Sequence, residues 1–390
     1  MPTFSLDSEQ TTWCAELRAL AVERLRPLAE KGEPGHVNRP LVETLGELGL
    51  LDRLFEEGEG EEAGPMSGAL GLCLMRESLA YACTEAETAL ALQGLGAHPV
   101  HAYGSAAQRE RWLPEARAGR AIAAFALSEP GAGSDAAALS LTAEPDGSGG
   151  WRLTGGKRWI SNAPEADFYT VFARTSPGAG ARGVTAFLVP ADRPGLTGTP
   201  LDMLSPHPIG ALAFDSVRVG RDDVLGEVDR GFRVAMTTLN RFRPSVGAFA
   251  VGMATAALDA SLAHTAERDA FGGKLKDLQS VAHQIAEMAT RTEAARLMVY
   301  AAAAAYDEMG AAGAEGARGP GIARRAAMAK LLATETAQYV VDAAVQLHGA
   351  RALQRGHLLE HLYREVRAPR IYEGASEVQR TIIAKELYDR

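Results

Sequence analysis

The chain has 390 residues, of which 46% are hydrophobic and 23% charged, and its formal net charge is −9. This length and composition are typical of a folded protein with a large core, and they exclude a disordered or fibrous class. The negative charge argues against nucleic-acid and anionic-membrane partners. Three cysteines without metal-ligand spacing favour a reducing compartment, with the cytoplasm as the default. We expect neither an export signal nor a stretch apolar enough to span a membrane.

The spacing of hydrophobic residues changes twice along the chain. The first part is predicted to be mostly helical, because Leu17, Leu20, Val22 and Leu25 recur on one face and residues 75–95 contain few helix breakers. The changes in pattern predict three domains, at residues 1–120, 121–229 and 230–390.

The second and third parts differ in composition. Short β-type runs at 168–173 and 183–189 are separated by Gly, Pro and Asp clusters, which predicts a compact β domain. Long alanine-rich stretches then follow, and they predict antiparallel helices packed as a bundle. These stretches are 246–267, 281–306 and 321–347, with a glycine-rich loop at 310–321.

A cluster of small residues, SEPGAGSD, occupies positions 128–135. Glycines at alternate positions, Gly131 and Gly133, let backbone N–H groups approach a ligand closely, and serines supply short hydroxyl donors. A Gly/Pro cluster taken alone is more often a turn between strands. It is not a Rossmann fingerprint, because the third glycine is missing at the required spacing, so a nicotinamide site is disfavoured.

A second segment, residues 156–163, reads GKRWISNA. The indole of Trp159 could cover one face of an aromatic ligand while Ser161 presents a hydroxyl at the edge of that ligand. An isolated tryptophan is more often a core residue, so the residues of this segment alone leave both interpretations open.

The order and spacing of these two segments, together with IYEGASEVQR at residues 371–380, resemble the acyl-CoA dehydrogenase family. The resemblance extends from about residue 70 to residue 387. It implies an α+β multi-domain fold with a helical N-terminal domain, a central β-barrel-like domain and a C-terminal four-helix bundle. It also implies an FAD enzyme that acts on acyl thioesters in fatty acid metabolism.

The resemblance assigns flavin contacts in the central domain. Phe125, Leu127 and Ser128 would lie along the isoalloxazine ring, with Trp159 flanking the ring and Ser161 bonding near its N5 atom. Ser134 would approach the cofactor and the pantetheine arm of the substrate. The family often has threonine where this chain has Ser128 and Ser161, and the hydroxyl is preserved.

Further cofactor contacts are implied in the C-terminal half. Arg268 and Phe271 would hold the diphosphate and adenosine portion of FAD, and the forked donors of an arginine suit phosphate oxygens. Residues 346–350 would meet the FAD of a neighbouring subunit. This shared cofactor implies a homo-oligomer, and we expect a tetramer. Ala350 departs from the family, which commonly has glycine there. The remaining implied contacts are Gln279, Gln346, Gly349, Ala350, Ala375 and Glu377.

Glu373 is the candidate catalytic base. A glutamate taken alone is usually a solvated surface residue. The resemblance makes Glu373 the group that removes the α-proton of the thioester, and no carboxylate occurs at 239–243, where some family branches place the base. Asn240, Arg243 and Gly374 would contact the substrate.

The expected reaction is removal of the α-proton by Glu373 and transfer of the β-hydride to FAD, giving a trans-2-enoyl thioester. An electron-transferring flavoprotein is the expected electron acceptor. Three alternatives stay open: the same chemistry on an acyl group tethered to a carrier protein, a flavin oxidase or monooxygenase on this fold, and a non-catalytic relative. The histidines at 348, 357 and 361 lack a convincing third ligand, so no metal is expected.

Overall fold

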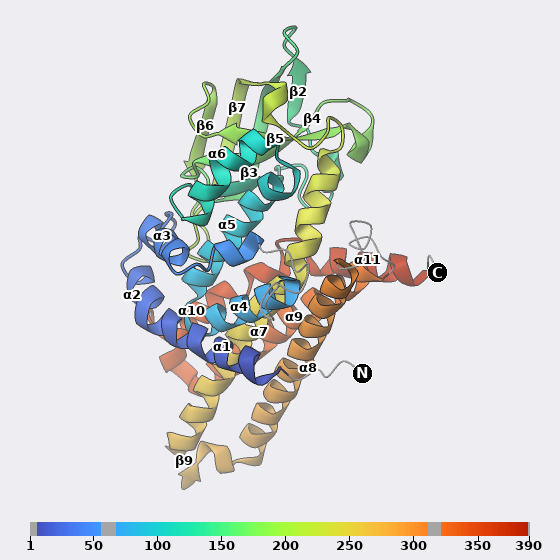
Figure 1. Cartoon of the computed structure of the whole chain (residues 1–390). Helices are drawn as coiled ribbons and strands as arrows, with labels where there is room; N and C mark the ends of the chain where they lie inside the picture. The colour runs from blue at the N-terminus through green and yellow to red at the C-terminus, as the bar shows by residue number, and fades with distance from the viewer. Residues whose placement is uncertain (1–5, 56–67, 311–320, 389–390) are drawn as a thin grey trace. The chain divides into compact units, whose positions relative to one another are not determined.

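The computed structural model of the chain describes residues 6–55, 68–310 and 321–388 (Figure 1). These residues form two compact units, each built from segments that are distant in the sequence. The sheet unit comprises 24–56 and 88–239, and the helical unit comprises 1–23, 57–87 and 240–390. Two long helices, α5 (Thr84–Tyr103) and α7 (Gly231–Glu267), contribute residues to both units.

An eight-stranded sheet forms the centre of the sheet unit. The strand order is β6-β7-β3-β2-β4-β5-β8, and β1 pairs with β4 in parallel. Strands β4 and β5 are rich in Val, Phe and Ala and almost wholly buried, as expected for strands covered on both faces. The strands are β1 (Ala123–Ala126), β2 (Thr142–Pro145), β3 (Trp151–Ser161), β4 (Phe168–Arg174), β5 (Val184–Pro190), β6 (Leu196–Pro200), β7 (Ile209–Val219) and β8 (Val224–Leu225).

Helix α5 fixes the position of β1. A Cβ atom at Gly96 would meet the backbone carbon of Ala123 at 2.6 Å, so only glycine allows the helix and the strand to approach this closely. The buried amide of Gln93 accepts a hydrogen bond from the Ala123 N–H and donates to the carbonyls of Ala116 and Ala121. The helices of this unit that lie outside α5 and α7 are α2 (Arg26–Ala29), α3 (Arg39–Glu47) and α6 (Ala106–Arg117).

Long helices form the helical unit. Alanine-rich faces of α7, α8 and α9 share one buried core with α4, because small side chains allow close helix packing. A short hairpin of β9 (Asp269–Ala270) and β10 (Gly273–Lys274) joins α7 to α8. The other helices are α1 (Ser8–Leu20), α4 (Gly68–Ala82), α8 (Gln279–Gly310), α9 (Ile322–His348), α10 (Leu358–Glu365) and α11 (Ser376–Tyr388).

The predicted fold class is confirmed, since helical N-terminal segments, a central sheet and C-terminal helices follow in the expected order. One local prediction is wrong. Val22 is 45% exposed because it lies five residues after the buried Leu17, which at about 100° per residue places it about 140° around the helix from Leu17. The stretch at 75–95 is helical as predicted, with Cys83 separating its two helices.

One further expectation needs correction. Helix α7 is long and apolar enough to cross a membrane by length and composition, although no such stretch was predicted. In its most apolar window 67% of the residues are buried inside the protein, which identifies a core helix. The predicted glycine-rich loop falls mainly on residues 311–320, which lie outside the described residues.

Candidate active site

Direct bonds join the two polar segments of the sheet unit. The backbone N–H of Arg158 donates to the Ser128 carbonyl at 3.0 Å. The ammonium of Lys157 donates to the Leu127 carbonyl at 2.9 Å and to Glu129 Oε1 at 2.8 Å. Residues 127–129 are therefore fixed against β3, although about 30 residues separate the two segments in the sequence.

Glu129 organises the turn that follows β1. One of its carboxylate oxygens accepts from the N–H and hydroxyl of Ser140, at 2.6 and 2.7 Å, and the other accepts from the Leu141 N–H at 3.0 Å. Burial raises the pKa of the Glu129 carboxyl, but the Lys157 ammonium and these donors outweigh burial and hold the pKa below its ordinary value. The carboxylate therefore stays ionised and keeps the loop in one conformation.

A β-bulge in β3 turns Trp159 out of the sheet. The pairing of β3 with β7 shifts register between Arg158 and Ile160, and Trp159 has a φ of 58°. Its side chain is 46% exposed, whereas Lys157 and Ile160 on either side are buried. Ser161 follows at the end of the strand and is half-buried. The segment thus presents a large aromatic surface and a hydroxyl at one edge.

The loop after β1 offers open backbone next to buried anchors. A Cβ atom added at Gly131 or Gly133 would meet no atom within 4 Å, and Ser134 is exposed beside them. Phe125 is half-buried and packs on Phe172, with ring centroids 4.9 Å apart. Leu127 is buried, while Ser128 is partly accessible. The structure therefore brings all six predicted residues of this segment pair into one region of the sheet unit.

In the helical unit, Arg268 and Phe271 belong to the hairpin between α7 and α8. Phe271 and Gly272 form its two-residue turn and both have positive φ, at 51° and 85°, which is the pattern of a type I′ turn. Phe271 is 91% exposed, and Arg268 and Gln279 are exposed as well. A phenylalanine at the tip of a hairpin is costly to leave in water, so this position indicates a contact surface.

The segment at the end of α9 lies against the same region. His348 stacks on His264 of α7 with ring centroids 4.2 Å apart, which places the end of α9 beside the turn of α7 that precedes Arg268. Gln346, Gly349 and Ala350 are exposed. Gly349 has a φ of 66°, which favours glycine. The structure thus groups the two C-terminal candidate cofactor segments.

Glu373 lies in a strained turn before α11. Its φ is 51° and that of Gly374 is 96°, and a positive φ at a glutamate is uncommon and concentrates at functional sites. Its carboxylate Oε2 is buried and receives no hydrogen bond from any residue that the structure describes. Gln379 donates to the Gly374 carbonyl at 2.8 Å and to the Glu373 carbonyl at 3.3 Å. The Oε2 atom of Glu373 can therefore still accept a hydrogen bond or a proton.

Three cations surround this carboxylate. Burial raises the pKa of Glu373 above its ordinary value, while the charges of Arg76, Arg243 and Lys330 pull it back down. Glu373 is therefore a stronger base than an exposed glutamate and still ionises. Its neighbour Tyr372 is 38% exposed.

Arg243 of α7 bonds directly to this turn. Its Nε donates to the Glu373 carbonyl at 3.3 Å, and its Nη1 donates to Asn240 Oδ1 at 2.8 Å. Both predicted substrate residues of α7 therefore belong to one network with the Glu373–Gly374 turn. Ala375 and Glu377 follow the turn, with Ala375 half-buried and Glu377 exposed.

Arg76 of α4 belongs to a buried ion pair with Glu87 of α5. Its Nη1 also donates to Ser245 Oγ at 2.7 Å, and Ser245 lies two residues after Arg243. The negative charge of Glu87 partly offsets the positive charge of Arg76. The pair therefore limits how strongly Arg76 stabilises the ionised form of Glu373.

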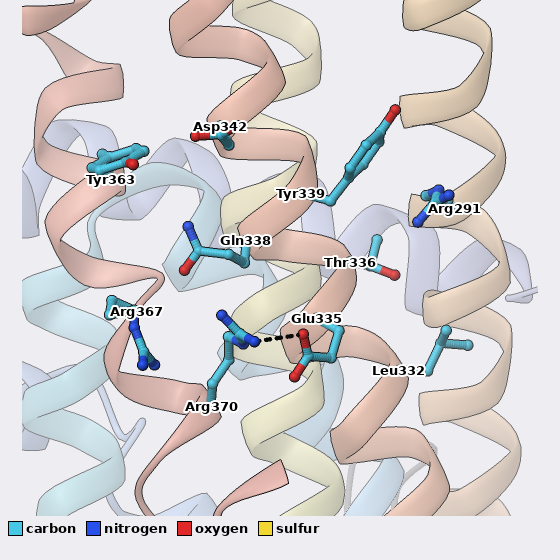
Figure 2. Close-up of a pocket in the computed structure, with 10 residues that line it drawn as sticks. All are labelled: Arg291, Leu332, Glu335, Thr336, Gln338, Tyr339, Asp342, Tyr363, Arg367 and Arg370. Carbon is cyan, nitrogen blue, oxygen red and sulfur yellow. Dashed lines mark ion pairs between the residues drawn. The ribbon is translucent and has the colours of Figure 1, made fainter.

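An open groove of about 600 Å³ crosses the helical unit on α8, α9 and α10 (Figure 2). None of the predicted site residues lines it. Figure 2 shows Arg370 and Glu335 pointing toward each other, and their Nη2 and Oε2 atoms are 2.9 Å apart. The groove is lined by Arg291, Leu332, Glu335, Thr336, Gln338, Tyr339, Asp342, Tyr363, Arg367 and Arg370.

The histidines do not gather as ligands. His361 contacts the hydroxyl of Thr84 at 2.6 Å, while His348 stacks on His264. Among the residues that the structure describes, no group of three or more His, Cys, Asp or Glu side chains could hold a metal ion.

The exposed groups of each unit fit a flavin dinucleotide. The sheet unit offers an outward indole, serine hydroxyls and open glycine backbone, which suit a planar ring with polar edges. The helical unit offers Arg268 for phosphate oxygens and the exposed ring of Phe271 for a base or sugar face.

Sequence reasoning missed several residues that shape these sites. Lys157 has the same parity along β3 as the buried Trp151 and Leu153, so a lysine on the inward face could have signalled a buried pair. No comparable signal identifies Lys330 or Arg76, because their partners, Gly374 in the turn before α11 and Ser245 on α7, are distant in the sequence.

Comparison with known proteins gives the same family for the whole length of the chain. The models of the acyl-CoA dehydrogenase N-terminal, middle and C-terminal domains match residues 7–120, 124–217 and 229–388. The cyclohexane-1-carbonyl-CoA dehydrogenase of Geobacter metallireducens is 34% identical over 98% of this chain and 98% of that protein.

Solved structures agree with this assignment. A glutaryl-coenzyme A dehydrogenase in complex with glutaryl-CoA has a TM-score of 0.90 and 32% identity, covering 100% of this chain and 97% of that one. PigA with FAD and proline has a TM-score of 0.88 and 27% identity, covering 99% of each chain. The chain belongs to the acyl-CoA dehydrogenase family of FAD-dependent oxidoreductases.

Proposed function

We propose that this enzyme oxidises the saturated acyl group of a coenzyme A thioester to the trans-2-enoyl thioester, with Glu373 as the base. The observation that carries the proposal is the state of Glu373. It is held in a strained turn among three cations, and one of its carboxylate oxygens is buried without a hydrogen bond from any described residue. This is the arrangement expected of a general base that removes a proton from the carbon atom of a substrate.

The protein supplies the proton acceptor and the orientation of the substrate. The Glu373 carboxylate takes the proton from the α-carbon, and the electron pair of that C–H bond becomes the new α,β double bond as the β-hydrogen leaves with its electrons. FAD, when bound, accepts that hydride. The Glu373 N–H would polarise the thioester carbonyl and stabilise the negative charge that develops on its oxygen. Arg243 and Asn240 would hold the pantetheine arm.

The residues proposed for the flavin ring are Phe125, Leu127, Ser128, Trp159 and Ser161. Ser134 would lie near both the flavin and the substrate arm, since it is exposed beside the open glycines of its loop. Trp159 would cover a face of the ring and exclude water from it. In the helical unit we assign Arg268, Phe271, Gln279, Gln346, Gly349, Ala350, Ala375 and Glu377 to the cofactor.

Coenzyme A is favoured as the handle of the substrate, because the relative from Geobacter metallireducens and the glutaryl-CoA dehydrogenase are both named for CoA thioesters. The acyl-carrier thioester is the alternative. We propose an electron-transferring flavoprotein as the electron acceptor and the cytoplasm as the location. The thiols of Cys14, Cys73 and Cys83, with no disulfide among them, support a reducing compartment.

We also propose that the enzyme is a homotetramer. Large apolar side chains remain exposed on the C-terminal helices and hairpin, among them Phe271 at 91% and Leu353 at 71%. Such exposure on a soluble fold favours a subunit interface. Light scattering of the purified protein would test the proposal, and a monomer would contradict it.

Anaerobic titration with a panel of saturated acyl-CoAs, of varied length and with branched or cyclic groups, tests the reaction. We expect loss of the oxidised flavin absorbance and formation of a 2-enoyl-CoA that chromatography identifies. If only acyl groups bound to a carrier protein bleached the flavin, the substrate would be an acyl-carrier thioester and not a coenzyme A thioester. Rapid reoxidation of the bleached enzyme when air is then admitted would instead favour the oxidase alternative.

Replacement of Arg268 by Met is expected to weaken FAD binding about 10- to 100-fold, because one charge-assisted hydrogen bond contributes roughly 1.5–3 kcal/mol. Fluorescence titration of the apoprotein with FAD gives the dissociation constant. Arg325→Met, which removes an exposed arginine of α9, is the control and should bind FAD normally. Equal affinity of the Arg268 variant and the wild type would exclude the assigned contact.

A further inference from the structure

Glu335 of α9 bonds to both ends of the segment that carries Glu373. Its Oε2 pairs with Arg370 at 2.9 Å, and its Oε1 accepts from the Ser376 hydroxyl at 2.6 Å. Figure 2 shows the Arg370 side of this arrangement. Because Arg370 and Ser376 flank residues 371–375, a single carboxylate fixes where the segment leaves the short 3₁₀ helix η9 (Ala368–Arg370) and where it enters α11.

Lys330 reaches the middle of the same segment. It lies on α9 five residues before Glu335, its side chain is fully buried, and its Nζ donates to the Gly374 carbonyl at 2.8 Å. Burying a lysine is costly unless its charge is compensated. Here the compensation comes from that carbonyl and from the charge of the Glu373 carboxylate.

We propose that Lys330 and Glu335 are positioning residues for the proposed base, with Glu335 fixing both ends of the turn and Lys330 holding its centre and favouring the ionised carboxylate. This inference rests on the proposed function. Neither residue needs to contact the substrate, because both act on the backbone and the charge of the Glu373 turn.

The backbone of this turn explains why such tethers are needed. Glu373 and Gly374 have consecutive positive φ values, and a glutamate in this conformation is strained. Without fixed ends and a fixed centre, the turn would relax and move the carboxylate. A displacement of about 1 Å in an active site can cost about 100-fold in rate.

Charged groups from every neighbouring element act on this pair. Burial lowers the pKa of Lys330 to about 8, so the ammonium form still predominates at neutral pH and stabilises the Glu373 carboxylate. The groups whose charges act on Glu373 or Lys330 are Arg76 of α4, Arg243 of α7, Glu335 of α9 and Glu377 of α11. The phenol of Tyr372 beside the base is uncharged, because burial raises its pKa well above the ordinary value.

Lys330→Met is the main test. We expect kcat to fall about 10- to 100-fold with little change in KM, because orientation is lost and the thioester contacts remain. The acid limb of the kcat profile should move to higher pH, since removing a cation raises the pKa of the carboxylate that must be ionised. Lys330→Arg, which keeps the charge, should bring that limb back toward its wild-type position.

Glu335→Gln should lower kcat without a comparable move of the acid limb, because Glu335 acts on the ends of the turn and its charge acts on Lys330. Asp342→Asn is the matched control. Asp342 lies two helical turns further along α9 and lines the same groove, so its kcat, KM and profile should match those of the wild type.

A purely structural role would give a different result. If Lys330→Met lowers only the melting temperature, and folded flavin-loaded protein keeps wild-type kcat and acid limb, the inference is wrong. Infrared difference spectra between each protein and its Glu373→Gln counterpart follow protonation of that carboxyl without substrate. A higher pKa in Lys330→Met would support the charge effect even if no acyl-CoA bleached the flavin, which would refute only the proposed reaction.

Discussion

Glu373→Gln is expected to keep its fold and its FAD while kcat falls by at least about 100-fold, which is the loss typical of removing a general base. Glutamine preserves the shape of the side chain and the backbone N–H, so the turn and its bonds to Gln379 and Lys330 should persist. Only the capacity to accept a proton from the substrate is lost. Single-turnover bleaching of the flavin by an acyl-CoA measures this step directly.

The pH dependence of the wild type follows from the environment of the same residue. Burial raises the pKa of Glu373 above its ordinary value, with Arg76, Arg243 and Lys330 limiting the rise. Glu373 abstracts a proton only when ionised, so kcat should increase with pH through this raised pKa, and the limb should be absent in the glutamine variant.

The control for this experiment is Glu287→Gln. Glu287 is an exposed glutamate of α8 that pairs with Arg291 at 2.6 Å, and its replacement should leave turnover and the pH profile unchanged. Turnover of Glu373→Gln close to that of the control would remove Glu373 from the mechanism.

Lys157→Met is expected to destabilise the protein by about 3–5 kcal/mol, because it leaves Glu129 as a buried carboxylate without its cation. The side chains of the two residues are 0% and 3% exposed. The variant also loses the bond from Lys157 to the Leu127 carbonyl, so FAD affinity should fall together with stability. Urea unfolding at neutral pH gives the free energy of unfolding.

A double variant, Lys157→Met with Glu129→Leu, separates the cost of the unpaired charge from the loss of the tether. It should recover part of the stability, because both charges are gone, but the Ser140 and Leu141 donors lose their acceptor. A single variant within about 0.5 kcal/mol of the wild type would contradict the predicted role of the pair.

The stability of the protein at low pH is a second test of the Lys157–Glu129 pair. The pKa of Glu129 is lower in the folded protein than its ordinary value of 4.5, so its stabilising contribution is present above that value and is lost as pH falls through the lower folded pKa. The double variant lacks this contribution and should lose less stability in acid than the wild type.

The sequence predicts the architecture well where an element is defined by a local pattern of hydrophobic residues. The buried runs at 168–173 and 183–189 lie within one residue of β4 and β5, because a strand covered on both faces reads as a continuous apolar stretch. The prediction for Val22 is wrong because five residues separate it from Leu17, and at 3.6 residues per turn this spacing places the two side chains on different faces of the helix.

The sequence proposes candidate site residues but not their geometry. Short segments make Trp159 and Glu373 candidates, but the bulge that exposes the indole and the positive φ of the glutamate are set by backbone geometry. The groups that act on Glu373 come from α4, α7 and α9, so only the folded chain brings Arg76, Arg243 and Lys330 together.

Isotope effects on flavin bleaching test the central claim most directly. The enzyme is mixed anaerobically with an accepted acyl-CoA that carries deuterium at the α-carbon or at the β-carbon. If Glu373 removes the α-proton while the β-hydride leaves, both labels should slow bleaching, and Glu373→Gln should show little bleaching with any substrate. A bleaching rate that deuterium at the α-carbon does not change, or a normal bleaching rate in Glu373→Gln, would contradict the proposed role of this carboxylate.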